Sequence, residues 1–363
     1  MVKFRCERDV LVEALDTAGR AATARVALPV LSGLRLVLQG DTLRVTGSDL
    51  DLTITSSVQV NGIENGTAVL PKLIADIAHK LSPGAIEVDT TGDRPRVHGG
   101  RSEFFLNAIS ADEYPSAPEP VGESVTLQSA ELAEGLKQVV RAASGDESRP
   151  ILTGVLMTAE EGGLRLVSTD SYRLAVRDLP GTVALREGQQ VLVPSRALTE
   201  VARALDVDSD VTLVLGERDA TFEVGSLHLS TRLIEGDFPD YRRLIPSTQP
   251  TPLILGRQAF AEALRRVKLM ARENSPVRLR MQADMLELRA INQELGEAVE
   301  ELDAKYDGPE LTVAFNPEYL LDGLEVTTGD EVSIETTDAQ KPATLRSLDS
   351  SDFLYLLMPV RVS

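Results

Sequence analysis

The chain repeats one pattern at a fixed offset along its length. The segment at residues 29–34, PVLSGL, returns at residues 150–155 as PILTGV, 121 positions later. Asp49 returns as Asp170 at the same offset. Self-similarity at a constant spacing indicates tandem copies of one folding unit. Since the chain has 363 residues, three units of this size fill it.

Each unit begins with the pattern of an amphipathic helix, in which apolar residues recur at i, i+4, i+7 and i+11. The three stripes consist of Leu11, Leu15, Ala18 and Ala22, then Leu132, Leu136, Val139 and Ala143, then Phe260, Leu264, Val267 and Ala271. Segments that alternate between apolar and polar residues follow, as at 34–38, 42–45 and 277–281. This period of two predicts half-buried strands.

A second, shorter helix is expected in each unit, at residues 71–81, 194–205 and 317–324. Each of these ranges begins with Pro, and we expect that residue at or near the first helical turn, where its missing N–H costs nothing. Closing strands are expected at 102–109 and 221–233. The predicted fold class is therefore α+β: three tandem repeats, each with two helices on strand-rich sheets.

Proline-rich segments separate the units. Residues 114–123 hold three prolines and residues 245–252 hold three more. Such segments act as semi-rigid spacers that continue neither a helix nor a central strand. We therefore expect domains at residues 1–119, 124–246 and 251–363.

The charge balance restricts the class of protein. A formal net charge of −19 disfavours a tight, salt-sensitive DNA binder of the repressor type, because phosphates repel an acidic surface. Cys6 is the single cysteine and has no internal disulfide partner. The chain also lacks an apolar N-terminal run and any stretch near the ~20 apolar residues of a membrane helix. A cytoplasmic protein is expected.

Basic residues nevertheless gather on the predicted helices, away from the apolar stripes. They are Arg20 in the first unit, Lys137 and Arg141 in the second, and Arg265, Lys268 and Arg272 in the third; the short helices add Lys72, His79, Lys80, Arg196 and Arg203. A solvated helix face also carries such residues. Their recurrence in three units favours a shared basic surface, although Glu318 and Asp322 on the last short helix depart from it.

No catalytic or metal-binding motif was found. The sequence contains no phosphate-binding glycine loop, no dinucleotide fingerprint and no Cys/His set at zinc spacing. Residues 206–210 resemble the start of a calcium loop, but the required glycine is replaced by Val211. Asp49 and Asp170 fit a turn in which the carboxylate accepts backbone N–H groups. We expect no cofactor and no metal; a metal-dependent hydrolase using Asp49, Asp170 or the acidic run at 206–210 is the rival hypothesis.

Four local motifs carry a resemblance to a known family. They are VSTDSYRLA at 167–175, GDFPDYRR at 236–243, FNP at 315–317 and LMPVR at 357–361. With the threefold repeat, they make the whole chain resemble the beta subunit of bacterial DNA polymerase III, the sliding clamp. The segment Lys341-Pro342-Ala343 is similar to actinobacterial members.

The resemblance implies a non-enzymatic homodimer that closes head to tail into a ring of six domains around duplex DNA. It also implies a processivity role, in which the ring tethers the polymerase III alpha subunit, the clamp loader and other proteins that carry short clamp-binding peptides. The alternative within the family is a second, specialised clamp copy whose altered pocket tolerates clamp-directed inhibitors.

The resemblance places a peptide-binding pocket between the second and third units. It implies Leu152, Thr169, Ser171, Tyr172, Arg173, Leu174, Pro239, Arg243, Leu244, Tyr319, Pro342, Leu356, Met358 and Val360 as pocket residues. Leucine, methionine and valine suit buried anchors, and Arg173 and Arg243 suit a polar peptide flank. Ordinary core packing is the alternative for Leu174 and Leu356. Ser171 and Tyr172 stand where many members have Gly-His, and Pro342 where many have Ser.

Two further sets follow from the resemblance. DNA-facing positions are Arg25, Lys72, Arg149 and Arg196, joined on helix geometry by Arg20, Lys137, Arg141, Arg265, Lys268 and Arg272. The ring interface would join residues 94–106 to Leu269, Met270 and residues 297–301 of the partner. The named residues of the first stretch are Arg94, Arg96, Arg101, Phe104 and Leu106, and those of the last are Glu297, Glu300 and Glu301. Opposite charges on the two edges would fix the register. Glu103 stands where the family often has Arg.

Overall fold

The computed structural model describes residues 1–22, 28–115, 121–160, 162–205, 210–246, 251–271 and 275–361. Its helices are α1 (Arg8–Gly19), α2 (Leu73–Lys80), α3 (Ser129–Val140), α4 (Ser195–Ala204), α5 (Arg257–Val267) and α6 (Pro317–Val326). Short 3-10 turns include η1 (Pro29–Ser32), η2 (Pro150–Thr153), η3 (Tyr241–Leu244) and η4 (Lys268–Met270). The chain forms two compact structural units, which differ from the three repeating units of the sequence; the latter are called repeats from here on. Structural unit 1 comprises Met1–Ala130 with Arg203–Leu233, and unit 2 comprises Glu131–Ala202 with Ile234–Ser363.

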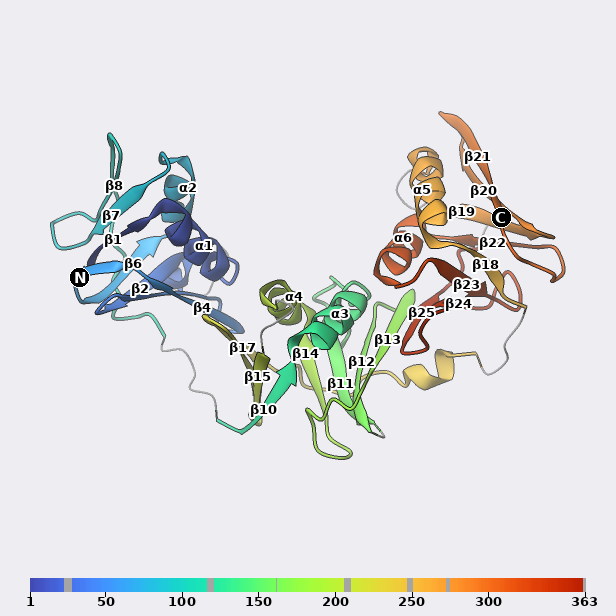
Figure 1. Ribbon diagram of the computed structural model, residues 1–363, viewed down its shortest axis with the longest axis horizontal. Helices are drawn as coiled ribbons and strands as arrows, with labels where there is room; N and C mark the ends of the chain where they lie inside the picture. The colour runs from blue at the N-terminus through green and yellow to red at the C-terminus, as the bar shows by residue number, and fades with distance from the viewer. Residues whose placement is uncertain are drawn as a thin grey trace. The chain divides into compact units, whose positions relative to one another are not determined.

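Unit 1 contains two antiparallel sheets. The first has the order β5 (Asn61–Glu64), β1 (Lys3–Glu7), β7 (Ala85–Asp89), β8 (Arg96–Gly99), β9 (Ser102–Phe105). The second runs β10 (Glu123–Gln128), β15 (Asp210–Leu215), β16 (Asp219–Val224), β17 (Leu227–Arg232), β4 (Leu52–Gln59), β3 (Thr42–Ser48), β2 (Gly33–Gln39), β6 (Gly66–Pro71). Its two halves meet where β17 pairs with β4, with Leu229 opposite Ile54 (Figure 1).

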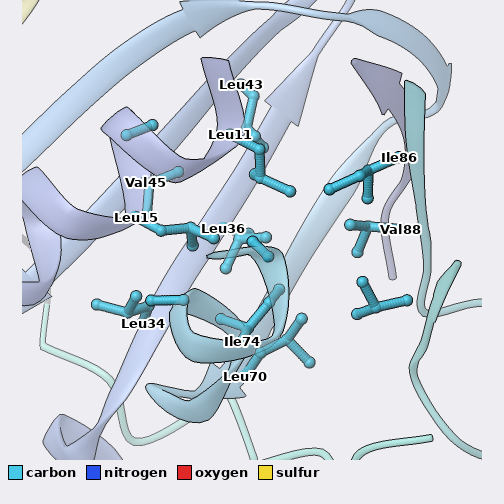
Figure 2. Close-up of a cluster of buried hydrophobic side chains, with 14 of the residues drawn as sticks. Leu11, Leu15, Leu34, Leu36, Leu43, Val45, Leu70, Ile74, Ile86 and Val88 are labelled. Carbon is cyan, nitrogen blue, oxygen red and sulfur yellow. The ribbon is translucent and has the colours of Figure 1, made fainter. Parts of the chain in front are cut away.

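The core of unit 1 lies between the helices and the two sheets. Figure 2 shows Leu11 and Leu15 of α1 pointing toward Leu36 of β2, with Ile74 of α2 beneath them. These side chains have no exposed surface. Because α1 lies so close to β3, a Cβ added at Gly47 would stand 2.0 Å from the carbonyl oxygen of Ala18. Only glycine allows that approach.

Unit 2 also contains two antiparallel sheets. The larger has the order β14 (Gln190–Pro194), β11 (Gly154–Glu160), β12 (Gly163–Thr169), β13 (Arg173–Pro180), β25 (Phe353–Leu357), β24 (Ala343–Ser347), β23 (Glu331–Glu335), β18 (Leu253–Gly256). The smaller runs β21 (Gly296–Asp303), β20 (Met285–Asn292), β19 (Val277–Gln282), β22 (Leu311–Phe315). The second and third repeats meet where β13 pairs with β25, with Leu174 opposite Leu356 (Figure 1).

The predicted threefold repeat of helices and antiparallel sheets is confirmed. In each repeat a first strand, β1, β10 or β18, precedes the corresponding helix, α1, α3 or α5, and a second helix follows at α2, α4 or α6. The middle repeat contributes strands to both units, because its two groups of strands pair with different neighbours. Half of each proline-rich spacer, residues 116–120 and 247–250, lies outside the described residues.

Several predicted boundaries were wrong. Pro71 and Pro194 end strands β6 and β14 instead of opening helices, and only Pro317 occupies a first turn. There the Asn316 side chain caps α6 by accepting from the backbone N–H of Glu318 at 2.9 Å. The strand expected at 102–109 ends at Phe105, and the range 221–233 is the hairpin β16–β17 rather than one strand.

Candidate functional site

The turn between β12 and β13 is held by its own side chains. Asp170 Oδ1 accepts from the backbone N–H groups of Tyr172, at 2.9 Å, and Arg173, at 3.0 Å. Thr169 Oγ1 accepts from the N–H of Ser171 and donates to the carbonyl of Arg173 at 2.6 Å. Ser171 has φ 81°, a left-handed conformation that costs energy for a residue with a Cβ. The predicted turn role of Asp170 is confirmed.

The same turn occurs in the first repeat, 121 positions earlier. Asp49 Oδ1 accepts from the N–H groups of Asp51, at 3.2 Å, and Leu52, at 2.9 Å. Leu50 has φ 83°, which matches Ser171. The described residues contain no group of three or more His, Cys, Asp or Glu side chains placed to hold a metal ion. The residues 206–209 lie outside the described part.

The C-terminal segment contacts this turn. The backbone N–H of Met358 donates to the carbonyl of Tyr172 at 2.8 Å. The Tyr172 ring stacks on that of Tyr319 from α6, with centroids 6.3 Å apart and planes 26° apart. Tyr172 is 59% exposed and Met358 is 38% exposed. Large apolar groups from three separate segments are thus presented together at the surface of unit 2.

Arg173 lies among acids and aromatic rings of its own chain. Its Nε donates to Asp170 Oδ2 at 3.0 Å, its Nη1 donates to Asp322 Oδ2 on α6, and its guanidinium lies 4.4 Å from the Tyr319 ring centroid. Burial opposes its charge, but Tyr355 and the two carboxylates outweigh that effect and raise the pKa of Arg173. The side chain is 10% exposed and lies against Tyr319, and its contact with a peptide flank stays a prediction.

Leu174 and Leu356 lie beneath this surface. They are 0% and 1% exposed and belong to one apolar cluster with Tyr241 and Leu354. Their contribution is that of core residues, as the alternative interpretation held. Leu152, 8% exposed, is also buried, and its carbonyl accepts from the N–H of Ser144 at 2.8 Å.

The other predicted pocket residues lie on neighbouring segments. Arg243 has an 86% exposed side chain that pairs with Asp240 at 2.7 Å, and Leu244 is 42% exposed. The N–H of Val360 donates to the carbonyl of Ala314 at 2.8 Å. Within the described ranges, no hydrogen bond, ion pair or ring contact joins Pro239, Arg243, Leu244, Pro342 or Val360 to the group around Tyr172 and Tyr319.

Three predicted DNA-facing cations are paired with acids of α6. Arg141 contacts Asp322 at 3.3 Å and Glu325 at 2.6 Å. Arg265 contacts Glu325 at 2.9 Å, and Lys268 contacts Glu318. The hydrogen bond from Arg141 is the largest of the causes that lower the pKa of Glu325. The expected basic surface is therefore partly neutralised in unit 2; the sequence analysis noted Glu318 and Asp322 but missed Glu325.

The other cations of that set are found in varied surroundings. Lys137 and Arg196 are exposed on α3 and α4. Arg149 pairs with Asp146 at 3.1 Å and donates to Ser171 Oγ at 3.2 Å. Arg20 donates to Thr17 Oγ1 at 3.3 Å, and Lys72 donates to the carbonyl of Ala22 at 3.0 Å. Arg25 and Arg272 lie outside the described residues.

Each unit presents one exposed strand edge among the predicted interface residues. β9 is the last strand of its sheet, and Phe104 and Phe105 on it are 37% and 52% exposed. β21 is likewise terminal, and Val299 on it is 45% exposed; Leu269 of η4, which lies beside β21 in the fold, is 80% exposed. Phe105 and Val299 fall within the stretches expected to form the interface, and an exposed aromatic or β-branched residue on an edge strand suits such a role.

Other predicted interface residues have partners inside their own unit. Leu106 is 6% exposed and packs against the core of unit 1, and its place in the interface stays a prediction. Arg96 pairs with Glu87 at 2.8 Å and Glu103 at 3.0 Å, while Glu300 pairs with Arg266. The residues that remain exposed on the two edges include Arg101, Glu297 and Glu301. Arg94 donates to the carbonyl of Phe105 at 3.2 Å, and Met270 is half-buried.

In the part of the chain that the structure describes, no helix has both the length and the apolar character needed to cross a membrane.

Three family models match the chain in order. They describe the N-terminal, central and C-terminal domains of the DNA polymerase III beta subunit and match residues 2–118, 126–240 and 242–361. Among curated relatives, the beta sliding clamp of Streptomyces coelicolor is 36% identical over 375 residues, covering 100% of both chains. That of Bacillus subtilis is 32% identical, covering 99% of this chain and 100% of the relative.

Solved structures of similar proteins agree with the fold. The DNA polymerase sliding clamp from Bacillus subtilis superposes with a TM-score of 0.88 at 31% identity, covering 100% of both chains. A sliding clamp from Pseudomonas aeruginosa bound to griselimycin gives a TM-score of 0.88 at 30% identity, covering 99% of this chain and 100% of that one.

Proposed function

This chain belongs to the family of DNA polymerase III beta subunits, and we propose that it is a sliding clamp, a processivity factor that encircles duplex DNA. The observation that carries this proposal is that the three domains of the family follow one another along a single chain, from residue 2 to residue 361. We assign the domains to residues 1–119, 124–246 and 251–363. The protein acts by enclosure in the cytoplasm, without catalysis, cofactor or metal.

The two exposed edges support ring closure by a homodimer. Edge strands offer unpaired backbone groups that can add a strand from another chain. A closed ring of two copies needs β9 of each copy to meet β21 of the other, which is the simplest heterologous closure. Arg101 on one edge and Glu297 and Glu301 on the other supply opposite charges that favour this register.

The cluster around Tyr172, Tyr319 and Met358 supports a peptide-binding role. An exposed group of aromatic and methionine side chains over a buried leucine base suits the insertion of leucine or phenylalanine anchors. Its partners are short peptide tails of the polymerase alpha subunit, the clamp loader and other DNA-processing proteins. A small contact of this kind is weak and exchangeable, which allows partners to alternate.

Binding to DNA relies on topology rather than on tight electrostatic contact. Cations such as Lys137 would make non-specific phosphate contacts without reading sequence. The acids of α6 limit the positive charge near α3 and α5, which keeps such contacts weak. Weak phosphate contacts are sufficient for a duplex enclosed by the ring, because a closed ring can leave the DNA only by opening or by sliding off an end.

Retention on circular DNA tests the enclosure. The full chain is loaded with its clamp loader and ATP onto a nicked circular plasmid, and the bound fraction is measured by gel filtration. We expect the protein to stay bound in high salt and to be released when the plasmid is linearised. Equal release from circular and linear DNA would contradict the proposal.

Peptide binding tests the pocket separately. The double substitution Met358→Ala with Arg243→Ala should weaken binding of a peptide with leucine and phenylalanine anchors by about tenfold or more. Val183→Ala is a matched control, because Val183 is also an exposed apolar side chain of unit 2, at 70% exposure, on a different segment. Unchanged affinity in the double variant would remove the pocket assignment.

A further inference from the structure

Unit 2 contains a cavity whose lining is basic. It has a volume of about 490 Å³ and lies against the outer face of β19 and β22, beside the C-terminal segment. Arg278 and Arg361 line it together with Thr312, Ala314, Gln340 and Val360. No carboxylate is among its described lining residues, although the whole chain has a net charge of −19.

Arg278 stands among other arginines. It is directly opposite Arg289 on β20 and two positions from Arg280 on β19, where alternate residues share a face. Arg280 pairs with Glu310 at 2.7 Å, and Arg289 lies 3.4 Å from Glu287. Within the described ranges, neither Arg278 nor Arg361 has an acid at salt-bridge distance.

Among these strand arginines, Arg278 is the one whose charge no acid of the described residues offsets. Like charges directly opposite one another on paired strands repel. Two guanidinium groups that lack an acid partner among the described residues, next to the hydroxyl of Thr312 and the amide of Gln340, provide several hydrogen-bond donors for a carboxylate. Ala314 and Val360 supply apolar contact for the methylene groups of the Asp or Glu side chain that ends in this carboxylate.

The cavity adjoins the proposed peptide site through one short segment. The backbone N–H of Met358 donates a hydrogen bond to the carbonyl of Tyr172. Two residues later, the N–H of Val360 donates to the carbonyl of Ala314, and Val360 lines the cavity. Two residues of chain span at most about 7 Å. A peptide anchored at Met358 and Tyr172 can therefore place a neighbouring residue in the cavity.

We propose that this cavity is an anion subsite for a carboxylate that flanks the apolar anchors of a docked peptide, with Arg278 and Arg361 as its recognition residues. The proposal rests on the peptide-binding role proposed above and extends it, since it makes acidic flanks a determinant of partner choice. Arg173 already pairs with Asp170 and Asp322. The flanking carboxylate is therefore recognised by Arg278 and Arg361.

Two peptides with identical leucine and phenylalanine anchors test the proposal on the full-length protein. One carries Asp and Glu on both flanks, and the other carries Asn and Gln at the same positions. By fluorescence anisotropy at low salt, the acidic peptide should bind about fivefold or more tightly, as expected for partly exposed charged pairs. Arg278→Gln should remove this difference and leave the affinity of the neutral peptide unchanged.

Arg280→Gln is the matched control. Arg280 lies on the same strand and the same face but is paired with Glu310, so its loss should leave the preference for the acidic peptide intact. Equal binding of both peptides to the unmodified protein, or an equal loss in the two variants, would overturn the anion subsite while leaving the peptide pocket in place. If neither peptide binds, both the pocket and the subsite are wrong.

Discussion

Asp322 of α6 and Arg173 of β13 form an ion pair that joins the third repeat to the turn carrying Tyr172. The other carboxylate oxygen of Asp322 accepts from Arg141 of α3 at 3.3 Å. One carboxylate therefore binds an arginine of the proposed DNA-facing set and an arginine beneath the proposed peptide site. Tyr319, one turn earlier on α6, covers the guanidinium of Arg173.

Asp322→Asn should weaken binding of the anchored peptide by about threefold to tenfold. The substitution leaves the buried Arg173 with one fewer acid, which loosens its contact with Tyr319 and hence the stack with Tyr172. Glu325→Gln is the control, since Glu325 pairs with Arg141 and Arg265 but not with Arg173. A double-mutant cycle between Asp322→Asn and Arg173→Gln checks the mechanism by titration calorimetry. Additive losses in peptide affinity would show that the pair does not position the site.

Glu325→Gln should increase weak binding to a short duplex. It frees Arg265 from its acid and leaves Arg141 paired with Asp322 alone, so one to two more cations become available to phosphate. The plot of log affinity against log salt should steepen by about 1 for each cation that engages. Lys137→Gln should lower the affinity for the duplex and make the plot of log affinity against log salt less steep. Unchanged salt dependence in both variants would place these helices away from DNA.

Unit 1 should lose stability in acid through Asp89. The hydrogen bond from Lys3, followed by that from Thr91, lowers the pKa of Asp89 from 3.8 to about 2. A carboxyl group with a lowered native pKa stabilises the fold above its usual pKa, and this stabilisation is lost as the pH falls from about 4 toward 2. Urea unfolding followed by circular dichroism across that range should show a smaller pH dependence in Asp89→Asn. The exposed Asp93→Asn serves as control; the same slope in both would refute the assignment.

Substitutions at the two exposed edges should yield monomers. A charge introduced by Phe104→Asp on β9, or by Leu269→Asp on η4, would be buried without a partner in the proposed interface. Ile63→Asp is the matched control, because Ile63 is 51% exposed on β5, the opposite edge of the sheet that contains β9. Analytical ultracentrifugation at micromolar concentration gives the masses. A monomeric unmodified chain, or a dimer in all three variants, would rule out this closure.

The candidate site could be predicted in part. The motif at 167–175 and the LMPVR segment identified Tyr172 and Met358, and the turn chemistry of Asp170 follows from its neighbours in sequence. The role of Arg173 could not be foreseen, because its partner Asp322 is 149 positions away. The burial of Leu106 was equally hidden, since an apolar residue near the end of a predicted strand fits an interface or a core.

By itself, the sequence determined the threefold repeat, the apolar stripes of α1, α3 and α5, and the turns at Asp49 and Asp170. The repeat is visible when the sequence is compared with itself at an offset of 121 positions. The stripes and turns depend on spacings of a few residues, which local geometry converts directly into faces and caps. The tertiary structure alone decided that β17 pairs with β4 and β13 with β25, that acids of α6 neutralise Arg141 and Arg265, and that Arg278 has no acid beside it among the described residues. The physical reason is that charge pairing and strand pairing act over a few ångströms in space, and the chain brings residues together across long sequence separations only when it folds.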